Sequence, residues 1–381
     1  MENREYILPM GDWVTQSQKA VVIRFSGQRI VLSTGALGGG LRTDLTGVFD
    51  YNDCDNAGVC SEMLGETMLE HQKNIAIRLG LDPYYTTGLD TAANMDNLAR
   101  STMVYENFSV TALVTAGADG NAARAGDPSS LHEHSGSPCF ILPGTINIFL
   151  FIDAKLSSGA MVEAMMTATE AKSATLQELM VPSKYSCGLA TGTGTDGIVI
   201  VSNAESSVDL YNAGKHFKLG ELLAAAVKKT VREALYRQSG LCSQSQHNLF
   251  ARLKRFGITP DQVSQNYDAF CPNDQERCYI WMSQLSCDGF MVVWASMYAH
   301  LLDQLDWELL TLGETTDWAE ALMSMMFCHY GCQREPRIPF AHDKEGSVQQ
   351  MVQTIQKGLA EVLRIHNEAE KLQMNAQDFN K

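Results

Sequence analysis

A lysine in the middle of an apolar helix face is the side chain whose position most directly suggests chemistry. At about 100° per residue, Lys172 of a predicted helix over residues 160–180 shares a face with Met161, Met165, Ala168, Leu176 and Leu179. An ammonium group there must extend to solvent, pair with a carboxylate or face a polar cavity. Candidate partners are Asp153 and Asp196, which each lie next to a predicted strand end. A paired Lys172 could act as an electrophile, or as a general acid if its pKa were lowered.

The second chemical feature is a run of glycines, threonines and one aspartate, Thr191-Gly-Thr-Gly-Thr-Asp-Gly197. Its glycines match the dinucleotide fingerprint G-x-G-x-x-G, but the run precedes a predicted strand, and position 216, where an acid would be needed, is histidine. We therefore reject a dinucleotide site. One remaining interpretation is a tight turn that leads into a buried strand. The other is a loop whose amides, hydroxyls (Thr193 and Thr195) and carboxylate (Asp196) face a polar ligand.

Two further loops combine small residues with polar ones. Residues 116–127 contain Asn121, Arg124 and Asp127, and residues 33–41 form a glycine loop that includes Gly39. Small residues let a ligand approach the backbone, and an arginine with an aspartate supplies directional polar contacts. Neither loop ends in the Lys-Ser/Thr pair of a phosphate-binding P-loop. The alternative for residues 116–127 is a solvated surface loop.

Histidines offer two weaker candidates. His216 begins a predicted helix, where the helix dipole disfavours the protonated ring and suits a neutral base. A purely structural histidine is the alternative. His132 and His134 alternate in a polar loop and could bind a metal, but no third ligand is identifiable, so no metal site is predicted.

These segments are positioned by a β-rich region followed by a helical one. Strands are predicted at 21–25, 29–33, 108–115, 145–152 and 197–201, and helices at 65–79, 94–105, 160–180 and 217–237. The first two strands flank Ser26-Gly27-Gln28 and are predicted to form a hairpin. Because no helix is predicted between the third and fourth strands, we expect a mixed or antiparallel sheet layered with helices. The predicted fold class is α+β, with mixed α/β layers in the N-terminal two thirds and a mainly helical C-terminal third.

We expect two domains, residues 1–240 and residues 241–381. The last predicted helix begins with a capping box from Ser347 to Gln350. Its apolar stripe consists of Val348, Met351, Val352, Ile355, Leu359 and Val362. The stripe predicts a helix docked on its own domain, and a contact in a homodimer is the alternative.

Composition excludes several classes of partner. The 381 residues carry a net charge of −15, so nucleic acid and anionic membrane surfaces are not expected partners. The longest strongly apolar stretch, near residues 146–152, is too short to span a bilayer, and no export signal is visible at the start. We therefore expect a cytoplasmic protein whose ten cysteines are reduced and mostly buried as small hydrophobic residues.

Taken in order, the polar segments resemble a known family. The segments are Thr115–Asp127, Pro143–Ile148, Asp153–Leu156, Ala168–Lys172, Ala190–Asp196 and Gly214–Glu221. Together they are similar to the adenosylcobinamide amidohydrolases, enzymes of corrinoid salvage. The resemblance is strongest over residues 105–237 and extends more weakly back to residues 33–41. It does not include the helical C-terminal third.

The resemblance implies a reaction and a substrate. Members cleave the amide that joins a side chain of the corrin ring to aminopropanol, which converts adenosylcobinamide to adenosylcobyric acid; some act on complete cobamides. The implied partner is a corrinoid small molecule, and no cofactor is identified. Candidate substrate-binding residues are Asn121, Arg124, Asp127, Asn147, Asp153, Gly192, Gly194 and Gly39.

Amide hydrolysis needs a nucleophile, stabilisation of the oxyanion and a proton for the departing amine. We expect the nucleophile to be activated water or the hydroxyl of Thr193 or Thr195. Asp196 or His216 would be the base, and Lys172 the electrophile or proton donor. The amides of Gly192 and Gly194 could bind the oxyanion. The alternatives are a non-catalytic corrinoid carrier or sensor, and a nucleotide-dependent transferase, which the missing P-loop and the acidic charge disfavour.

Overall fold

A computed structural model describes residues 3–54, 63–129, 144–272, 274–339, 341 and 343–378 of the chain. The chain divides into two units, Met1–Cys242 and Ser243–Lys381, and each is described by itself.

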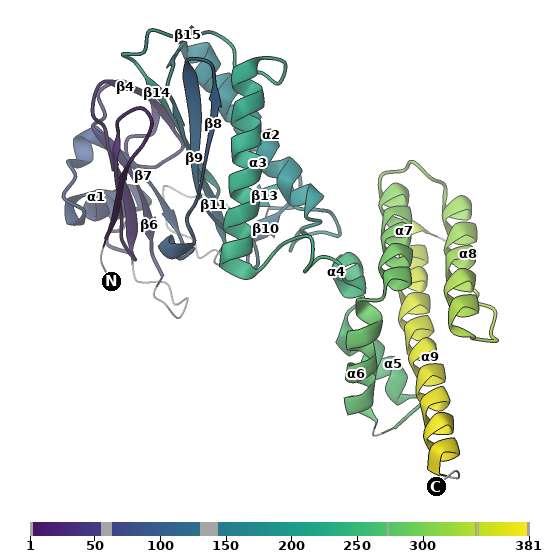
Figure 1. Cartoon of the computed structure of the whole chain (residues 1–381). Helices are drawn as coiled ribbons and strands as arrows, with labels where there is room; N and C mark the ends of the chain where they lie inside the picture. The colour runs from purple at the N-terminus through teal and green to yellow at the C-terminus, as the bar shows by residue number, and fades with distance from the viewer. Residues whose placement is uncertain are drawn as a thin grey trace. The chain divides into compact units, whose positions relative to one another are not determined.

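Two β-sheets form the centre of the first unit (Figure 1). The six-stranded sheet has the order β5 (Gly40–Arg42), β4 (Arg29–Ser33), β14 (Gly197–Asn203), β11 (Thr145–Ile152), β9 (Phe108–Gly117) and β8 (Ala99–Tyr105). The five-stranded sheet has the order β1 (Arg4–Ile7), β2 (Trp13–Gln16), β3 (Ala20–Arg24), β6 (Gly47–Asn52) and β7 (Thr86–Thr91). Within these sheets the pairs β11–β14 and β6–β7 are parallel and the others are antiparallel. The predicted mixed sheet and α+β class are therefore confirmed.

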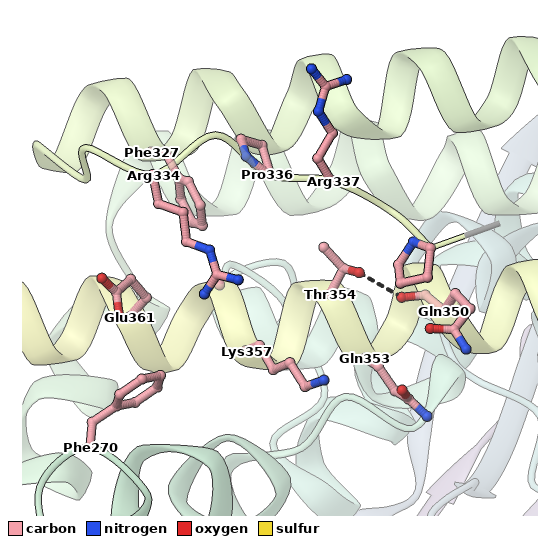
Figure 2. Close-up of a pocket in the computed structure, with 12 residues that line it drawn as sticks. Phe270, Phe327, Arg334, Pro336, Arg337, Gln350, Gln353, Thr354, Lys357 and Glu361 are labelled. Atoms are coloured by element: carbon pink, nitrogen blue, oxygen red, sulfur yellow. Dashed lines mark hydrogen bonds between the residues drawn. The ribbon is translucent and has the colours of Figure 1, made fainter.

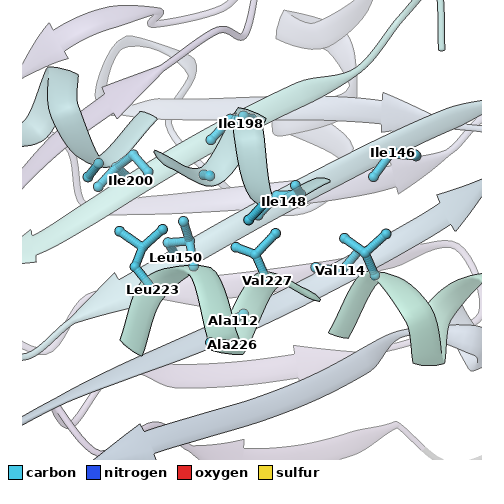
Figure 3. Close-up of a cluster of buried hydrophobic side chains, with 14 of the residues drawn as sticks. Ala112, Val114, Ile146, Ile148, Leu150, Ile198, Ile200, Leu223, Ala226 and Val227 are labelled. Carbon is cyan, nitrogen blue, oxygen red and sulfur yellow. The ribbon is translucent and has the colours of Figure 1, made fainter. Parts of the chain in front are cut away.

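The two sheets pack face to face, and helices cover their outer faces, because successive side chains of each strand point to opposite faces. Ile148 and Leu150 of β11 face α2 (Ser158–Glu178) and α3 (Lys218–Ser239), and Figure 3 shows residues of α3 against this face. Phe149 and Phe151, on the opposite face of β11, pack against the five-stranded sheet. The outer face of that sheet is covered by α1 (Met68–Arg78). All eight residues of β11 are buried, so this strand forms the centre of the layers.

Two short sheets and two 3₁₀ turns complete the first unit. β10 (Ala122–Ala123) pairs with β13 (Gly192–Thr193), and β12 (Lys155–Leu156) pairs with β15 (Asp209–Leu210). The 3₁₀ turns are η1 (Pro83–Tyr85) and η2 (Met95–Asn97).

Two predictions about local structure in this unit are wrong. The predicted helix at 94–105 is η2 followed by strand β8, in which buried Ala99 and Ser101 alternate with exposed Arg100 and Thr102. This period of two fits a strand paired with β9, and the pairing overrides the local helical pattern. The strands at 21–25 and 29–33 exist as β3 and β4, but they do not form a hairpin. β3 pairs with β2 and β6 and β4 pairs with β14 and β5, so the chain crosses between the sheets at residues 25–28.

All the regular secondary structure in the described part of the second unit is helical. Its helices are α4 (Leu249–Leu253), α5 (Pro260–Asp268), α6 (Gln275–Ser286), α7 (Gly289–Asp306), α8 (Leu312–Tyr330) and α9 (Lys344–Asp378), with a 3₁₀ turn, η3 (Lys254–Phe256), after α4. Met351, Ile355 and Leu359 of α9 are buried in the core of this unit. The predicted apolar stripe therefore packs within its own unit. The predicted capping box is wrong, because α9 begins at Lys344 and the Ser347 hydroxyl donates to the Asp343 carbonyl at 2.8 Å.

Among the described residues, no single helix has the length and hydropathy needed to cross a membrane. Helices α6 and α7 meet these criteria only together, with a bend of 79° between them.

The described cysteines differ from the prediction both in bonding and in burial. Cys54 is disulfide-bonded, so the prediction of reduced thiols is wrong there. Cys278 and Cys332 are buried thiols, and burial raises the pKa of each to about 11. These two thiols are unreactive near neutral pH. The prediction of mostly buried cysteines is nevertheless wrong, because Cys187, Cys287 and Cys328 are exposed.

Candidate active site

A pocket of ≈ 390 Å³ lies at one end of the two sheets of the first unit. It receives residues from the carboxyl ends of β4, β6 and β7, from the amino ends of β11 and β14, and from α1. The lining residues are Thr34, Gly35, Ala36, Asp53, Met68, Gln72, Leu89, Asp90, Thr91, Ala92, Gly144, Thr145, Asn147, Thr195, Asp196 and Gly197. Polar side chains at strand ends are positioned by the rigid layers behind them, which suits binding or catalysis.

Lys172 forms an ion pair with Asp196, one of its two predicted partners. The two side chains are only 8% and 11% exposed. Besides Lys172, Asp196 accepts hydrogen bonds from the backbone N–H groups of Ile146 and Thr193, both at 3.0 Å, and from the Thr193 hydroxyl at 2.5 Å. Four donors occupy this carboxylate, so it holds the 192–197 turn and is poorly placed to accept a further proton.

The glycines of this turn are explained by the same contacts. A Cβ atom on Gly192 would lie 2.3 Å from Oδ2 of Asp196 and 2.7 Å from Nζ of Lys172. The Gly194 amide donates to Oδ1 of Asn121 at 3.3 Å, and Nδ2 of this buried asparagine donates to the Gly144 carbonyl at 3.1 Å. Glycine is therefore needed at 192, because the ion pair lies against the backbone there. Asn121 holds the turn by its hydrogen bonds to Gly194 and Gly144.

The threonine hydroxyls near the pocket are already donors. Thr195 donates to the Gly144 carbonyl at 2.9 Å, which leaves its oxygen to accept from Thr145 at 2.5 Å. Thr193 donates to Asp196 but does not line the pocket. A hydroxyl nucleophile needs an adjacent base to take its proton. Of the two predicted nucleophiles, water therefore fits this pocket better than a threonine.

The structure separates one predicted base, His216, from the pocket. Lys218, at the amino end of α3, lies 4.9 Å from the Tyr105 ring, and Tyr105 pairs with the first residue of β9. Asp196, in contrast, binds Ile146, which pairs with Ala116 near the last residue of β9. The exposed His216, just before α3, therefore lies at the opposite end of the sheet from Asp196 and cannot be its partner base.

Other predicted binding residues also lie outside the pocket. Asp153 follows the carboxyl end of β11, where it accepts a hydrogen bond from Asn203 at 2.8 Å, again at the far end of the sheet. Asp127 binds the Arg124 amide at 2.9 Å and the Ser183 hydroxyl at 2.6 Å, which orders the loop beside β10. Gly39 packs on the Gly35 carbonyl, where a Cβ atom would approach to 2.2 Å. Asn147, Thr195 and Asp196 are the predicted residues that line the pocket; His132 and His134 lie outside the described residues.

A buried carboxyl group that the sequence analysis missed lies between the two sheets. Asp50 of β6 accepts hydrogen bonds from the Thr115 hydroxyl at 2.6 Å and from Nδ2 of Asn147 at 2.8 Å. Burial raises the pKa of Asp50 to about 7, despite these two hydrogen bonds. Asp50 therefore titrates near neutral pH while it positions Asn147.

Asp90 is a second missed carboxyl group, and it lines the pocket itself. Its Oδ2 accepts from Nε2 of Gln72 at 2.5 Å, whereas its buried Oδ1 has no partner. Burial and the nearby charge of Asp53 raise the pKa of Asp90 to about 7. Asn147 is 0% exposed and its Oδ1 also lacks a partner. Two buried, unpartnered acceptors thus lie among the residues that line one pocket, which is the arrangement expected where a ligand completes the hydrogen bonding.

Asp53, His71 and Asp90 form a third polar group, with ligand-type atoms within 4.8 Å of one another. Such a set could hold a metal ion only if a nitrogen of His71 were available. The Leu64 amide donates to Nδ1 of His71 at 2.9 Å, so the neutral ring carries its proton on Nε2, which faces Asp53 at 2.9 Å. A metal on Nε2 would require the opposite tautomer. The hydrogen bonding therefore favours a histidine that orients Asp53 by donating to it.

The missed residues left a weak signal in the sequence. Asp50 and Asp53 occur in Val48-Phe-Asp-Tyr-Asn-Asp53, and Asp90 in Gly88-Leu-Asp-Thr91. Carboxylates at the ends of short β-rich runs could have identified these residues. The sequence analysis did not predict β6 or β7, and without those strands there was no sheet end at which to place the acids.

The buried Asp50 gives a testable dependence of stability on pH. Between pH 4 and 7 the folded protein retains a proton on Asp50, whose pKa is about 7, that the unfolded chain has released. The free energy of unfolding therefore falls as the pH rises through this window. Asp50→Asn should remove part of this fall and stabilise the protein at pH 8 by a few kcal/mol, since one pKa unit corresponds to about 1.4 kcal/mol.

Urea denaturation at pH 5 and pH 8 measures this effect. The exposed Asp209 provides a matched control, because Asp209→Asn removes the same charge without a buried carboxyl group. An Asp50→Asn protein with the same pH slope as the wild type would contradict the assignment.

The second unit contains a separate pocket of ≈ 200 Å³, shown in Figure 2. Its walls are α9 and the segment after α8, with Phe270, Phe327, Arg334 and Lys357 among the lining side chains. Glu361, its one lining carboxylate, is held by Arg364 at 2.8 Å. This pocket lacks the unpartnered carboxyl group found in the first unit, so we place the candidate chemistry in the first unit.

The fold and the pocket define an α+β protein with a carboxyl-lined pocket. The family model described as adenosylcobinamide amidohydrolase matches residues 8–243, and the chain belongs to this family. The match covers more than half of the chain and includes every residue of the ≈ 390 Å³ pocket.

Two individual proteins are also similar to the chain. An uncharacterized protein of Methanocaldococcus jannaschii is 34% identical over 260 residues, which cover 61% of this chain and 97% of that protein. A crystal structure of a Pyrococcus horikoshii protein, PH0078, matches with 13% identity and a TM-score of 0.30, over 62% of this chain and 82% of that one.

Proposed function

We propose that the first unit hydrolyses the amide between the corrin ring side chain and aminopropanol in adenosylcobinamide. The products would be adenosylcobyric acid and aminopropanol, for use in cobamide salvage and remodelling, and complete cobamides would be further substrates. Family membership supports the reaction class. The observation that carries the proposal is the Asp90 carboxyl group, which lines the pocket with one unpartnered buried oxygen and a pKa of about 7.

The size of the pocket supports entry of the side chain that carries the amide. A volume of ≈ 390 Å³ is at the lower end of ligand sites and is too small for a corrin macrocycle. The ring would therefore remain outside while the amide reaches Asp90 and Asn147. Amide groups on the corrin periphery would find partners in the Thr34 and Thr91 side chains, which also line the pocket.

Acid–base catalysis by Asp90 would supply the proton transfers. As a carboxylate, Asp90 takes a proton from the attacking water; as a carboxylic acid, it then gives this proton to the amide nitrogen when the C–N bond breaks. The other hydrogen of the water is left on the new carboxylic acid and passes from it to the amine. The products are therefore an ammonium ion and a carboxylate that contains the oxygen of the water. A pKa near the working pH allows one group to serve both steps.

The predicted site residues near the turn would serve this reaction indirectly. Thr195 lies at the pocket and could redirect its hydroxyl from the Gly144 carbonyl toward the developing oxyanion. Lys172 and Asp196 would hold the turn that carries Thr195. In this proposal Asp196 is a positioning residue and Asp90 takes the role of base.

Incubation of the protein with adenosylcobinamide, followed by mass analysis of the products, tests the reaction. We expect release of aminopropanol and formation of adenosylcobyric acid. Tight binding of adenosylcobinamide without any product after long incubation would favour the alternative, a non-catalytic corrinoid carrier or sensor.

A chelator should leave hydrolysis essentially unchanged, because the tautomer of His71 does not suit metal binding by the Asp53, His71 and Asp90 set. The measurement is the initial rate of aminopropanol release with and without EDTA, after removal of bound metals by dialysis. Loss of activity in EDTA that returns on addition of Zn²⁺ or Mn²⁺ would contradict this prediction.

A further inference from the structure

The side chain of Gln72 in α1 connects two parts of the pocket wall. Its Oε1 accepts a hydrogen bond from the Leu37 amide at 2.7 Å, and its Nε2 donates to Oδ2 of Asp90 at 2.5 Å. Because a backbone N–H group can only donate, the first bond identifies the oxygen of this side chain, and the nitrogen must face Asp90. Gln72 is only 3% exposed, so water does not compete freely for either bond.

The Leu37 amide is a fixed donor, because its loop is packed on both sides. Residues 34–39 lie against β7, the strand that carries Asp90. A Cβ atom on Gly35 or on Gly38 would lie 2.4 Å from a backbone carbonyl oxygen of this strand. The Leu37 side chain is buried in the same apolar cluster as Ile75 of α1. The loop therefore determines which way the Gln72 amide is turned.

The two oxygens of Asp90 are consequently not equivalent. Oδ2 accepts from Gln72, whereas Oδ1 is buried and has no partner. Among the described residues, Gln72 is the only side chain that donates a hydrogen bond to this carboxyl group. The other ionisable groups that act on Asp90 are Asp50 and Asp53, on or directly after β6, and His71 of α1. An oxygen that already accepts a hydrogen bond is the less favourable place for a proton, so the proton of Asp90 belongs on Oδ1.

We propose that Gln72 is a positioning residue for the acid–base group: its donation to Oδ2 stabilises the carboxylate form of Asp90 and leaves Oδ1 to carry the proton. This inference rests on the proposed function for the role of Asp90. Gln72 itself transfers no proton. The loop that orients Gln72 also lines the pocket, through Thr34, Gly35 and Ala36, so the same loop forms the substrate-facing wall and sets the geometry of the acid–base group.

Two substitutions of Gln72 distinguish positioning from a purely structural role. Methionine and lysine are both long and unbranched, and both remove the acceptor of the Leu37 amide, but only lysine donates to Asp90. In Gln72→Met, the rise of kcat/KM with pH should move up by about one pH unit, because the carboxylate loses its donor. In Gln72→Lys, it should move down by at least about one pH unit, because an adjacent ammonium group favours the carboxylate. The same shift in both variants would overturn the proposal.

Gln177 of α2 provides the matched control, because it is exposed and lies outside the pocket. Gln177→Met and Gln177→Lys should leave the midpoint of the rise unchanged. Urea denaturation at pH 7 shows whether each variant is folded before the profiles are compared.

A measurement on the wild-type protein needs neither a variant nor turnover. The side-chain amide protons of Gln72, followed by NMR of ¹⁵N-labelled protein, should titrate with a midpoint near pH 7, the pKa of Asp90. Amide protons that do not titrate would overturn the proposal. Titration near pH 7 without hydrolysis of adenosylcobinamide at any pH would overturn the proposed function alone. Hydrolysis with one common shift in the two Gln72 variants would overturn the positioning role alone.

Discussion

Replacement of Asp90 by asparagine should lower kcat for release of aminopropanol from adenosylcobinamide by about 10²–10⁴-fold, the usual contribution of a general acid–base group. Asparagine has the same shape and can keep the contact with Gln72, so the pocket should remain intact. It cannot carry a proton between water and the leaving nitrogen. In the wild-type protein kcat/KM should rise with pH through about 7, because the carboxylate form takes the proton from water.

Asp50 is the control that separates catalysis from local structure. The pKa of Asp50 is also raised to about 7, and Asp50 accepts a hydrogen bond from Asn147, but it does not line the pocket. In Asp50→Asn, the new side chain can accept from Asn147 with its oxygen and donate to the Thr115 hydroxyl with its nitrogen. We therefore expect Asp50→Asn to retain most of its kcat and the rise of kcat/KM with pH. An Asp90→Asn protein that is folded and as active as the wild type would refute the role of Asp90.

Replacement of Lys172 by methionine should lower the free energy of unfolding by about 3–5 kcal/mol, the usual effect of removing one partner of a buried ion pair. Methionine fills much of the space of the lysine stem but leaves Asp196 buried without its cation. Three donors, from Thr193 and Ile146, would still hold the carboxylate in place. The folded state would then contain a buried charge without a counter-charge, which lowers its stability. Urea denaturation at pH 7 measures this change.

An exposed ion pair to helix α2 provides the control for this prediction. Glu170 of α2 pairs with Lys215, but this pair is exposed, at 67% and 50% for Lys215 and Glu170. Lys215→Met should therefore change the free energy of unfolding by no more than about 1 kcal/mol. Addition of Asp196→Asn to Lys172→Met should restore part of the lost stability, because no uncompensated charge is then buried. A double variant less stable than Lys172→Met would show that the ion pair is not what the lysine contributes.

The sequence was sufficient for features that depend on local pattern and on charge. The apolar runs of β9, β11 and β14 predicted buried strands, and the stripes of α2 and α3 predicted the helices that cover them. A lysine on an apolar helix face left an ion pair as one of three possibilities, because a buried ammonium needs a compensating charge. The structure shows the ion pair, with Asp196, one of the two candidate partners. The order of the polar segments indicated the family that the chain belongs to.

Which residues line the pocket could be seen only in the tertiary structure. Asp50 and Asp90 lie in β6 and β7 of the five-stranded sheet and Asp53 directly follows β6, whereas Asn147 lies in β11 of the other sheet. Their proximity depends on how the two sheets stack, which no local pattern encodes. Conversely, His216 and Asp153 had plausible residue types but lie at the far end of the sheet, because strand direction determines which end a residue occupies. Burial raises the pKa of Asp50 between the two sheets and that of Asp90 against α1, each to about 7, so these residue types acquired their chemistry only when the layers packed together.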